Sequence, residues 1–105
     1  MKHETILAKA EQEKILAKLE HARARLAEMD AIARERNAQA VIDKILALRA
    51  KRDVLQTRIR EFNDASEARA LEIKAEVEKN LAHFEDEVSK LASKLKSQSA
   101  TAGRR

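Results

Sequence analysis

The chain of 105 residues lacks cysteine, proline, tryptophan and tyrosine, and it has only one glycine and two phenylalanines. Without cysteine the protein has no disulfide and no thiolate metal site. With so few turn-forming residues a β fold is excluded, because sheets need frequent tight turns. The sequence also has no glycine-rich phosphate loop, no G-x-S-x-G nucleophile motif and no Glu-x-x-His metal pair. We therefore expect a protein that is not an enzyme and that binds no metal or cofactor.

Long apolar runs are absent as well. The run from Ile45 to Leu48 has four residues, whereas a membrane-spanning helix needs about 20. The first residues, MKHETILAKAEQEK, carry charges where a signal peptide would have an unbroken apolar stretch. These features predict a protein without a membrane span that resides in the cytoplasm.

Charge and alanine are abundant. Charged residues make up 38% of the chain, its formal net charge is +4, and alanine contributes about a fifth of the residues, which favours helix. A composition dominated by Ala, Glu, Lys, Leu and Arg is typical of coiled coils. The composition therefore predicts an all-α protein.

Two apolar stripes lie in residues 41–62 and 77–95. Along each stripe, steps of three and four residues alternate, which is the a/d spacing of a coiled coil. If the chain folds back near residue 64, the two stripes face each other across an antiparallel helical hairpin. The predicted interhelix seam consists of Val41, Ile45, Leu48, Leu55, Ile59 and Phe62 in the first stripe and Val77, Leu81, Phe84, Val88, Leu91 and Leu95 in the second.

The predicted architecture is a single domain, residues 1–97, built as a long antiparallel helical hairpin. One helix runs from about residue 3 to 62 and a second from about 64 to 97, and residues 98–105 form a disordered basic tail. At residues 34–40 the apolar spacing slips, and we favour a continuous helix with a stutter there, because no glycine, proline or N-cap pattern is present. The alternative is a turn at Asn37, which makes the protein a three-helix bundle.

The turn between the two arms is predicted at residues 62–64. Asn63 is a residue type that adopts the left-handed conformation at helix ends. Asp64 and Glu67 have the spacing of a capping box, in which Asp64 accepts a hydrogen bond from the backbone of Glu67. The sequence therefore places the start of the second helix at Asp64.

The predicted hairpin pairs a basic first arm with an acidic second arm. Its register places Lys44 near Glu87 and Arg49 near Glu78. Exposed pairs of this kind contribute about 0–1 kcal/mol each, so they select the orientation of the helices more than they stabilise them. Arg52 occupies a core a position, where a charge costs stability while fixing register, so Arg52→Leu is expected to raise the Tm.

The second arm of the hairpin is too short to cover all of the first. Several leucines would remain exposed, and because burying one is worth about 1.5–3 kcal/mol, the chain is expected to form a homo-oligomer. The predicted oligomer face consists of Ile15, Leu19, Leu26 and Met29.

Nucleic-acid binding is the alternative function. Arg49, Lys51, Arg58 and Arg60 give the first arm basic side chains that are candidates for phosphate contacts. Acidic residues interleave with them, however, and the chain offers no aromatic platform on which bases stack. An accessory nucleic-acid-binding protein is therefore the second choice.

Residues 48–81 read LRAKRDVLQTRIREFNDASEARALEIKAEVEKNL. This segment resembles a family of small bacterial coiled-coil proteins linked to stress responses, in which a basic, leucine-rich helix meets an Ala-Ser turn and an amphipathic second helix. The resemblance implies a coiled-coil protein and brings no catalytic residue to this chain. With the patterns above, it predicts a non-enzymatic, oligomeric coiled-coil interaction or scaffold protein, with a role in stress.

Overall fold

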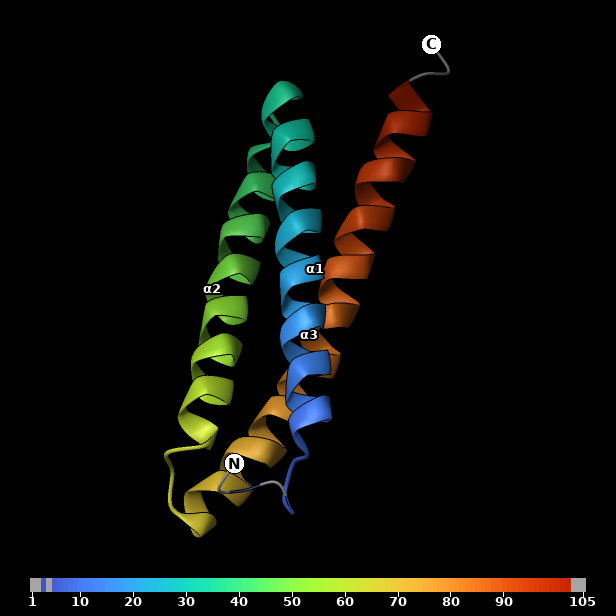
Figure 1. The fold of residues 1–105 in the computed structure, drawn as a ribbon. Coiled ribbons are helices and arrows are strands. Elements are labelled where there is room, and N and C mark those ends of the chain that lie inside the picture. Colours follow the sequence, from blue (N-terminus) through green and yellow to red (C-terminus); the bar gives the residue numbers. More distant parts are fainter. Residues whose placement is uncertain (1–2, 4, 103–105) are drawn as a thin grey trace.

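The computed structural model describes residue 3 and residues 5–102, the last five of these as backbone only. The described residues form three helices, α1 (Lys9–Glu35), α2 (Gln39–Phe62) and α3 (Glu67–Ala102). They lie in a bundle with extents of 58 × 20 × 18 Å, in which α1 and α3 run in one direction and α2 in the other (Figure 1). The all-α prediction is confirmed, and the architecture is the alternative one, a three-helix bundle.

The predicted continuous helix from residue 3 to 62 is wrong, because α1 ends at Glu35. Asn37 has φ 55°, in the left-handed region that asparagine tolerates better than most residues. The Ala38 N–H donates to the carbonyl oxygen of Ala33 (2.8 Å) and the Asn37 N–H to that of Arg34 (3.1 Å). These two bonds make a Schellman motif, which satisfies carbonyls at the end of α1 and reverses the chain into α2.

The turn between α2 and α3 lies where it was predicted, but its cap differs. Asn63 has φ −71° and ψ −24°, so it is not left-handed. The residue that caps α3 is Ser66, whose Oγ accepts a hydrogen bond from the Arg69 N–H at 3.2 Å. The predicted capping box that begins at Asp64 is therefore wrong, because α3 starts at Glu67 and its N-cap lies two residues after Asp64.

The C-terminal end of α3 extends beyond the predicted limit of residue 97. The helix continues to Ala102, so the expectation of a disordered tail is wrong for residues 98–102. The remaining tail residues, 103–105, lie outside the described part of the chain.

The core runs the length of the bundle between the three helices. All twelve residues of the predicted seam are buried, six from α2 and six from α3. The buried side chains of α1 complete the core from the third side, and they are Gln12, Leu19, Ala22, Leu26, Met29 and Ala33. The heptad spacing of the sequence thus identified the core faces of α2 and α3.

Before α1, which begins at Lys9, His3 lies against the turn between α2 and α3, so the helix does not extend to residue 3. His3 is buried, and its Nε2 donates to the carbonyl oxygen of Ala65 at 2.6 Å. The His3 ring also meets the edge of Phe62, with ring centroids 5.4 Å apart. The Gln12 amide donates to the Leu7 carbonyl at 3.0 Å. These contacts close the end of the bundle at which the α2–α3 turn lies.

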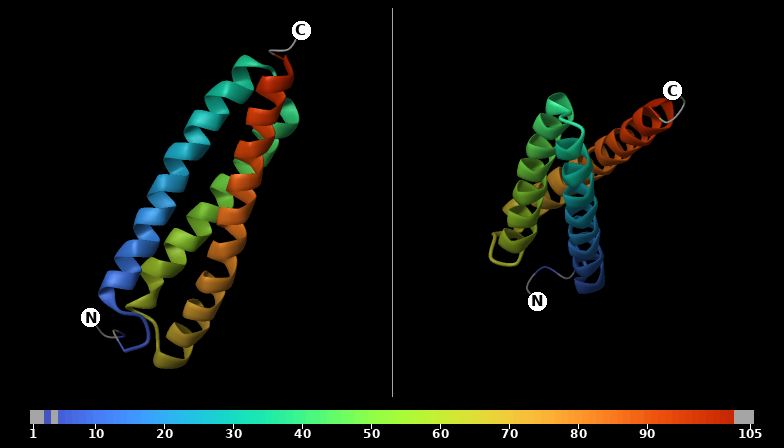
Figure 2. Two further views of the ribbon diagram at one scale, coloured as in Figure 1. Left: turned by 90° about the vertical axis from the view of Figure 1, so that its right-hand side faces the viewer. Right: turned by 90° about the horizontal axis from the view of Figure 1, so that it is seen from above.

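The three helices are not packed equally. α1 and α2 lie side by side along their length, whereas α3 crosses them obliquely, and its last turns diverge from both (Figures 1 and 2). The helices that follow each other in the chain are joined by short turns, which keep them adjacent. No such connection holds α1 against α3.

Candidate functional site

The outer face of α2 carries apolar side chains that face solvent. Leu46 is 50% exposed and Val54 is 48% exposed, and the exposed Ala50 lies between them. These three residues, the α2 stripe, follow one another at intervals of four, so they lie on one side of the helix, opposite the seam. The sequence prediction considered only seam positions and missed this stripe, although its i, i+4, i+8 spacing is visible in the sequence.

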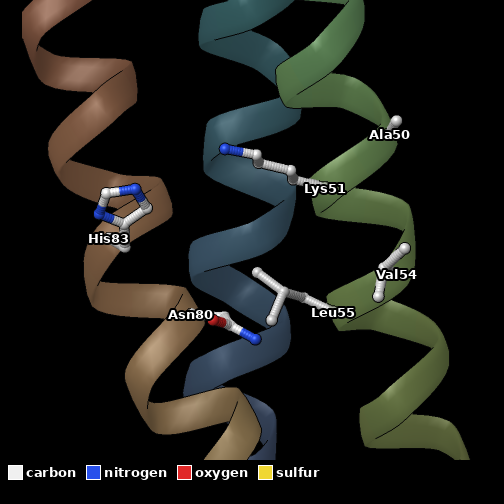
Figure 3. Close-up of a pocket in the computed structure, with 6 residues that line it drawn as sticks. All are labelled: Ala50, Lys51, Val54, Leu55, Asn80 and His83. Atoms are coloured by element: carbon white, nitrogen blue, oxygen red, sulfur yellow. The ribbon is translucent and has the colours of Figure 1, made fainter.

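A hollow of about 360 Å³ lies beside the stripe, between α2 and α3. In Figure 3, Leu55 and Asn80 point into the space between the two helices, whereas Ala50 and Val54 lie on the outer edge of α2. Its lining is formed by Ala50, Lys51, Val54, Leu55, Asn80 and His83. Exposed apolar side chains of the stripe therefore lie next to a mostly apolar hollow. Helices pack against each other through surfaces of this kind, with the side chains of one entering the grooves of the other.

An ion cluster shares Lys51 and His83 with the lining of this hollow. The Glu87 carboxylate accepts hydrogen bonds from Lys44 Nζ and Lys51 Nζ, each at 2.7 Å, and lies 3.2 Å from His83 Nε2. The hydrogen bond from Lys44, followed by that from Lys51, lowers the pKa of Glu87 to about 2. Because all of these groups already hold the carboxylate, Glu87 is an ion-pair residue and not a candidate general base.

The two predicted interhelix ion pairs have different outcomes. Lys44 pairs with Glu87, as the register predicted. Arg49 does not meet Glu78, because its guanidinium faces α1 and lies 4.0 Å from Asp30. Glu78 instead accepts Lys74 of its own helix at 3.7 Å. The third helix, which the hairpin prediction omitted, accounts for this difference.

Arg52 lies in the core, as its a position predicted, and its charge has partners. Its Nε donates to the carbonyl oxygen of Leu19 at 3.1 Å. Its terminal nitrogens lie 3.0 Å from Asp53 and 3.4 Å from Glu20. A buried guanidinium of this kind links α2 to α1 while its aliphatic stem fills the core.

The residues of the predicted oligomer face do not form a free surface. Leu19, Leu26 and Met29 are buried within the bundle, and Ile15 is half-buried. The turn at Asn37 folds α1 back along α2, so the chain covers this face by itself. The premise that these side chains need a second copy to cover them is therefore wrong.

Three of the four predicted phosphate contacts are held by acidic side chains. Lys51 is bound to Glu87, and Arg49 lies near Asp30. Arg58 lies 3.3 Å from Glu76 and, through its other nitrogen, 3.3 Å from Glu61. Arg60 is exposed and forms no ion pair with another described residue. The basic arm thus has much of its charge compensated within the fold.

Among the described residues, no three His, Asp or Glu side chains gather closely enough to hold a metal ion. None of the helices in the described part of the chain is long and apolar enough to cross a membrane. Comparison of the chain with protein-family models, with curated proteins and with solved structures gives no match.

Proposed function

We propose that the protein is a non-enzymatic scaffold that pairs with a second copy of itself through the α2 stripe, with the two α2 helices antiparallel. The observation that carries this proposal is the exposed Leu46–Ala50–Val54 stripe beside the hollow at Leu55. Exposed apolar side chains that share one face of a helix are candidates for a protein–protein contact.

The α2 stripe is self-complementary about a two-fold axis. An axis through Ala50 places Leu46 of each copy opposite Val54 of the other, and the small Ala50 side chains meet at the centre, where they allow close approach. The same axis places Asp43 opposite Thr57, so the carboxylate of one copy can accept a hydrogen bond from the hydroxyl of the other. Such an isologous contact closes the assembly at two copies.

The hollow beside Val54 supplies the recess that this packing needs. A Leu46 side chain that arrives opposite Val54 lies next to this space of about 360 Å³ and can fill part of it, as a knob enters a hole in a coiled coil. Because the contact spans only a few helical turns, it is at the small end of stable interfaces. We expect a Kd of about 1–100 μM.

The two remaining sequence predictions carry less support. The role in stress responses stays a prediction from the sequence resemblance alone. The nucleic-acid alternative is weakened by the ion pairs of Arg49, Lys51 and Arg58, because a compensated cation releases fewer counterions when it meets a phosphate.

Sedimentation equilibrium over a wide range of protein concentration tests the proposal. The wild-type chain is expected to pass from monomer to dimer, and the double variant Leu46→Glu, Val54→Glu to stay monomeric with its helix content intact. The matched control is Leu71→Glu on α3, since Leu71 is 52% exposed and lies outside the stripe; this variant should dimerise as the wild type does. A wild-type monomer at the highest concentration, or a dimer in the double variant, contradicts the proposal.

Disulfide trapping adds a geometric readout, because the chain has no cysteine of its own. Ala50→Cys lies on the proposed two-fold axis and should oxidise rapidly to a covalent dimer. Ala75→Cys, at an exposed position of α3, should not. Equal rates in the two variants would show that collisions, and not a specific contact, bring the thiols together.

A further inference from the structure

A second surface, independent of the α2 stripe, lies where α3 crosses α1. Two hollows of about 340 and 400 Å³ follow each other along these helices, and Arg25 lines both. On α1 they extend from Lys14 to Arg36, a distance of about 33 Å at the rise of an α-helix. We name the two hollows together the α1–α3 groove; they lie on the side where no turn joins the two helices.

The floor of the groove is apolar at its wider end. Met29 and Leu95 are buried there, Ala92 is half-buried, and Ile32 is 38% exposed. At the other end the floor is formed by the alanines Ala17 and Ala22 and by Val88. The groove is thus lined by small side chains in one half and by larger ones in the other. The side chains along one face of an additional helix can pack into it.

The rim of the groove is basic. Its lining includes Lys14, Lys18, Arg25, Arg36 and Lys96, against Glu28 and Glu85 as the acidic residues. Lys18 and Glu85 lie 3.8 Å apart, and Arg36 donates to the Leu95 carbonyl at 3.2 Å. Lys14, Arg25 and Lys96 form no ion pair with another described residue. Positive charge on both sides of the groove is therefore left uncompensated, unlike that of Arg49, Lys51 and Arg58 on α2.

We propose that the α1–α3 groove binds an acidic amphipathic helix of another protein, which completes a four-helix bundle. The apolar side of that helix covers Ile32 and its neighbours, and its Glu and Asp residues meet Lys14, Arg25 and Lys96. A helix of about 20 residues fits the length of the groove. The net charge of the rim selects acidic over basic helices, because like charges across an interface are unfavourable.

The alternative occupants fit less well. Within a second copy of this chain, helix α3 has seven acidic and six basic residues and its apolar face is buried against its own core, so it offers neither a strong negative charge nor a free apolar face. A nucleic acid would use the basic rim but leave the apolar floor around Ile32 uncovered, and no aromatic side chain lines the groove for base stacking. The combination of an apolar floor and a basic rim favours the acidic helix.

Fluorescence anisotropy with three labelled peptides of about 20 residues tests the inference. The peptides share one leucine stripe at a/d spacing and differ only at the flanking positions, which are glutamate, glutamine or lysine. The full-length chain is expected to bind the glutamate peptide about tenfold more tightly than the glutamine peptide and to leave the lysine peptide unbound. Equal affinity for the three peptides overturns the proposal.

Two sets of variants locate the binding. Ile32→Glu should abolish binding of the glutamate peptide, and Arg25→Glu with Lys96→Glu should reverse the preference toward the lysine peptide. The matched control, Arg60→Glu with Lys79→Glu, makes the same change in net charge at exposed positions outside the groove and should keep the wild-type preference. A reversal in the control as well would show a response to overall charge only, which contradicts a groove site. Circular dichroism of each variant checks that the bundle is intact.

The remaining outcomes separate this inference from the proposed dimer and from nucleic-acid binding. The Ile32→Glu variant should still dimerise, and the Leu46→Glu, Val54→Glu variant should still bind the glutamate peptide. If Ile32→Glu abolishes dimerisation, the groove is occupied by a second copy and the proposal of an acidic partner is wrong. It is also wrong if a labelled DNA duplex binds more tightly than the glutamate peptide at physiological salt and competes with it.

Discussion

The polar contacts that α3 makes with α2 differ from those that it makes with α1. Against α2, three cross-helix ion pairs flank the seam, with Lys44 and Lys51 on Glu87 and Arg58 on Glu76. Against α1, the corresponding cross-helix contacts are a 3.8 Å pair between Lys18 and Glu85 and the hydrogen bond from Arg36 to a main-chain carbonyl. The same helix thus has one side where the charges are complementary and one side where the rim is basic and mostly without ion-pair partners among the described residues.

This difference has its origin in the sequence. α2 and α3 are joined by a short turn, so their apolar stripes and their opposite charges meet in one register. α1 and α3 are not consecutive in the chain and run in the same direction. Their contact is therefore set only by the packing of the buried core. From this difference we expect the α2–α3 seam and the α1–α2 contact to contribute most of the stability of the bundle, and the α1–α3 side to contribute less.

The largest expected effect on the free energy of unfolding comes from a substitution in the α2–α3 seam, and we compare it with a substitution in the α1–α3 groove. Phe84 is buried on α3, and Phe84→Ala should lower the free energy of unfolding by about 3–5 kcal/mol, because it leaves a cavity. Ile32 lies on the groove floor and is partly exposed, so Ile32→Ala should cost about 1 kcal/mol or less. Urea unfolding followed by circular dichroism measures both. Similar losses would show that the groove side is as tightly packed as the seam.

The next effect concerns the charge that links α2 to α1. Arg52→Ala removes the bonds to Leu19 and Glu20 together with a buried aliphatic stem, and it should cost about 2–3 kcal/mol. Arg52→Met keeps most of the stem and buries no charge, so we expect a change of about 1 kcal/mol or less. This expectation replaces the gain in Tm that the sequence predicted for Arg52→Leu, because the guanidinium is bonded within the bundle.

Thermal and urea unfolding of the two Arg52 variants measure this difference. Equal destabilisation in both would assign the effect to the lost charge and its bonds. A large gain in Tm for Arg52→Met would restore the sequence-based view that the buried charge is costly.

The sequence predicted those parts of the fold that rest on many residues at once. The a/d spacing identifies the twelve seam residues because each contributes to one apolar stripe, and all twelve are buried. The register of the two apolar stripes predicted the contact between Lys44 and Glu87. Because such a pattern depends on many positions, a single residue that departs from it does not change the prediction.

The parts that the sequence did not predict depend on single residues and on long-range packing. The left-handed conformation of Asn37 costs about 1 kcal/mol or less in local backbone energy, so no local rule decides between a turn and a stutter there. The decision comes from burying Leu19, Leu26 and Met29 against the rest of the chain, which no local pattern reports. The same folding back of α1 moved Arg49 to Asp30 and created the groove beside α3.

The smallest expected effect is the pH dependence of stability that comes from the ion pairs between α2 and α3. The folded state holds the pKa of Glu87 at about 2, below its ordinary value of 4.5. Because the folded pKa is lowered, the stabilisation is fully present above pH 4.5 and is lost as the pH falls toward 2. Lys44 and Lys51 are about half exposed, so screening reduces the contribution to about 1 kcal/mol.

Urea unfolding at a series of pH values should show Glu87→Gln less stable than the wild type at neutral pH and equal to it near pH 2. The control Glu72→Gln, on the exposed side of α3, should leave the pH dependence of the wild type nearly unchanged. A constant difference between Glu87→Gln and the wild type across this range would mean that the pair with the two lysines does not help to close the α2–α3 side.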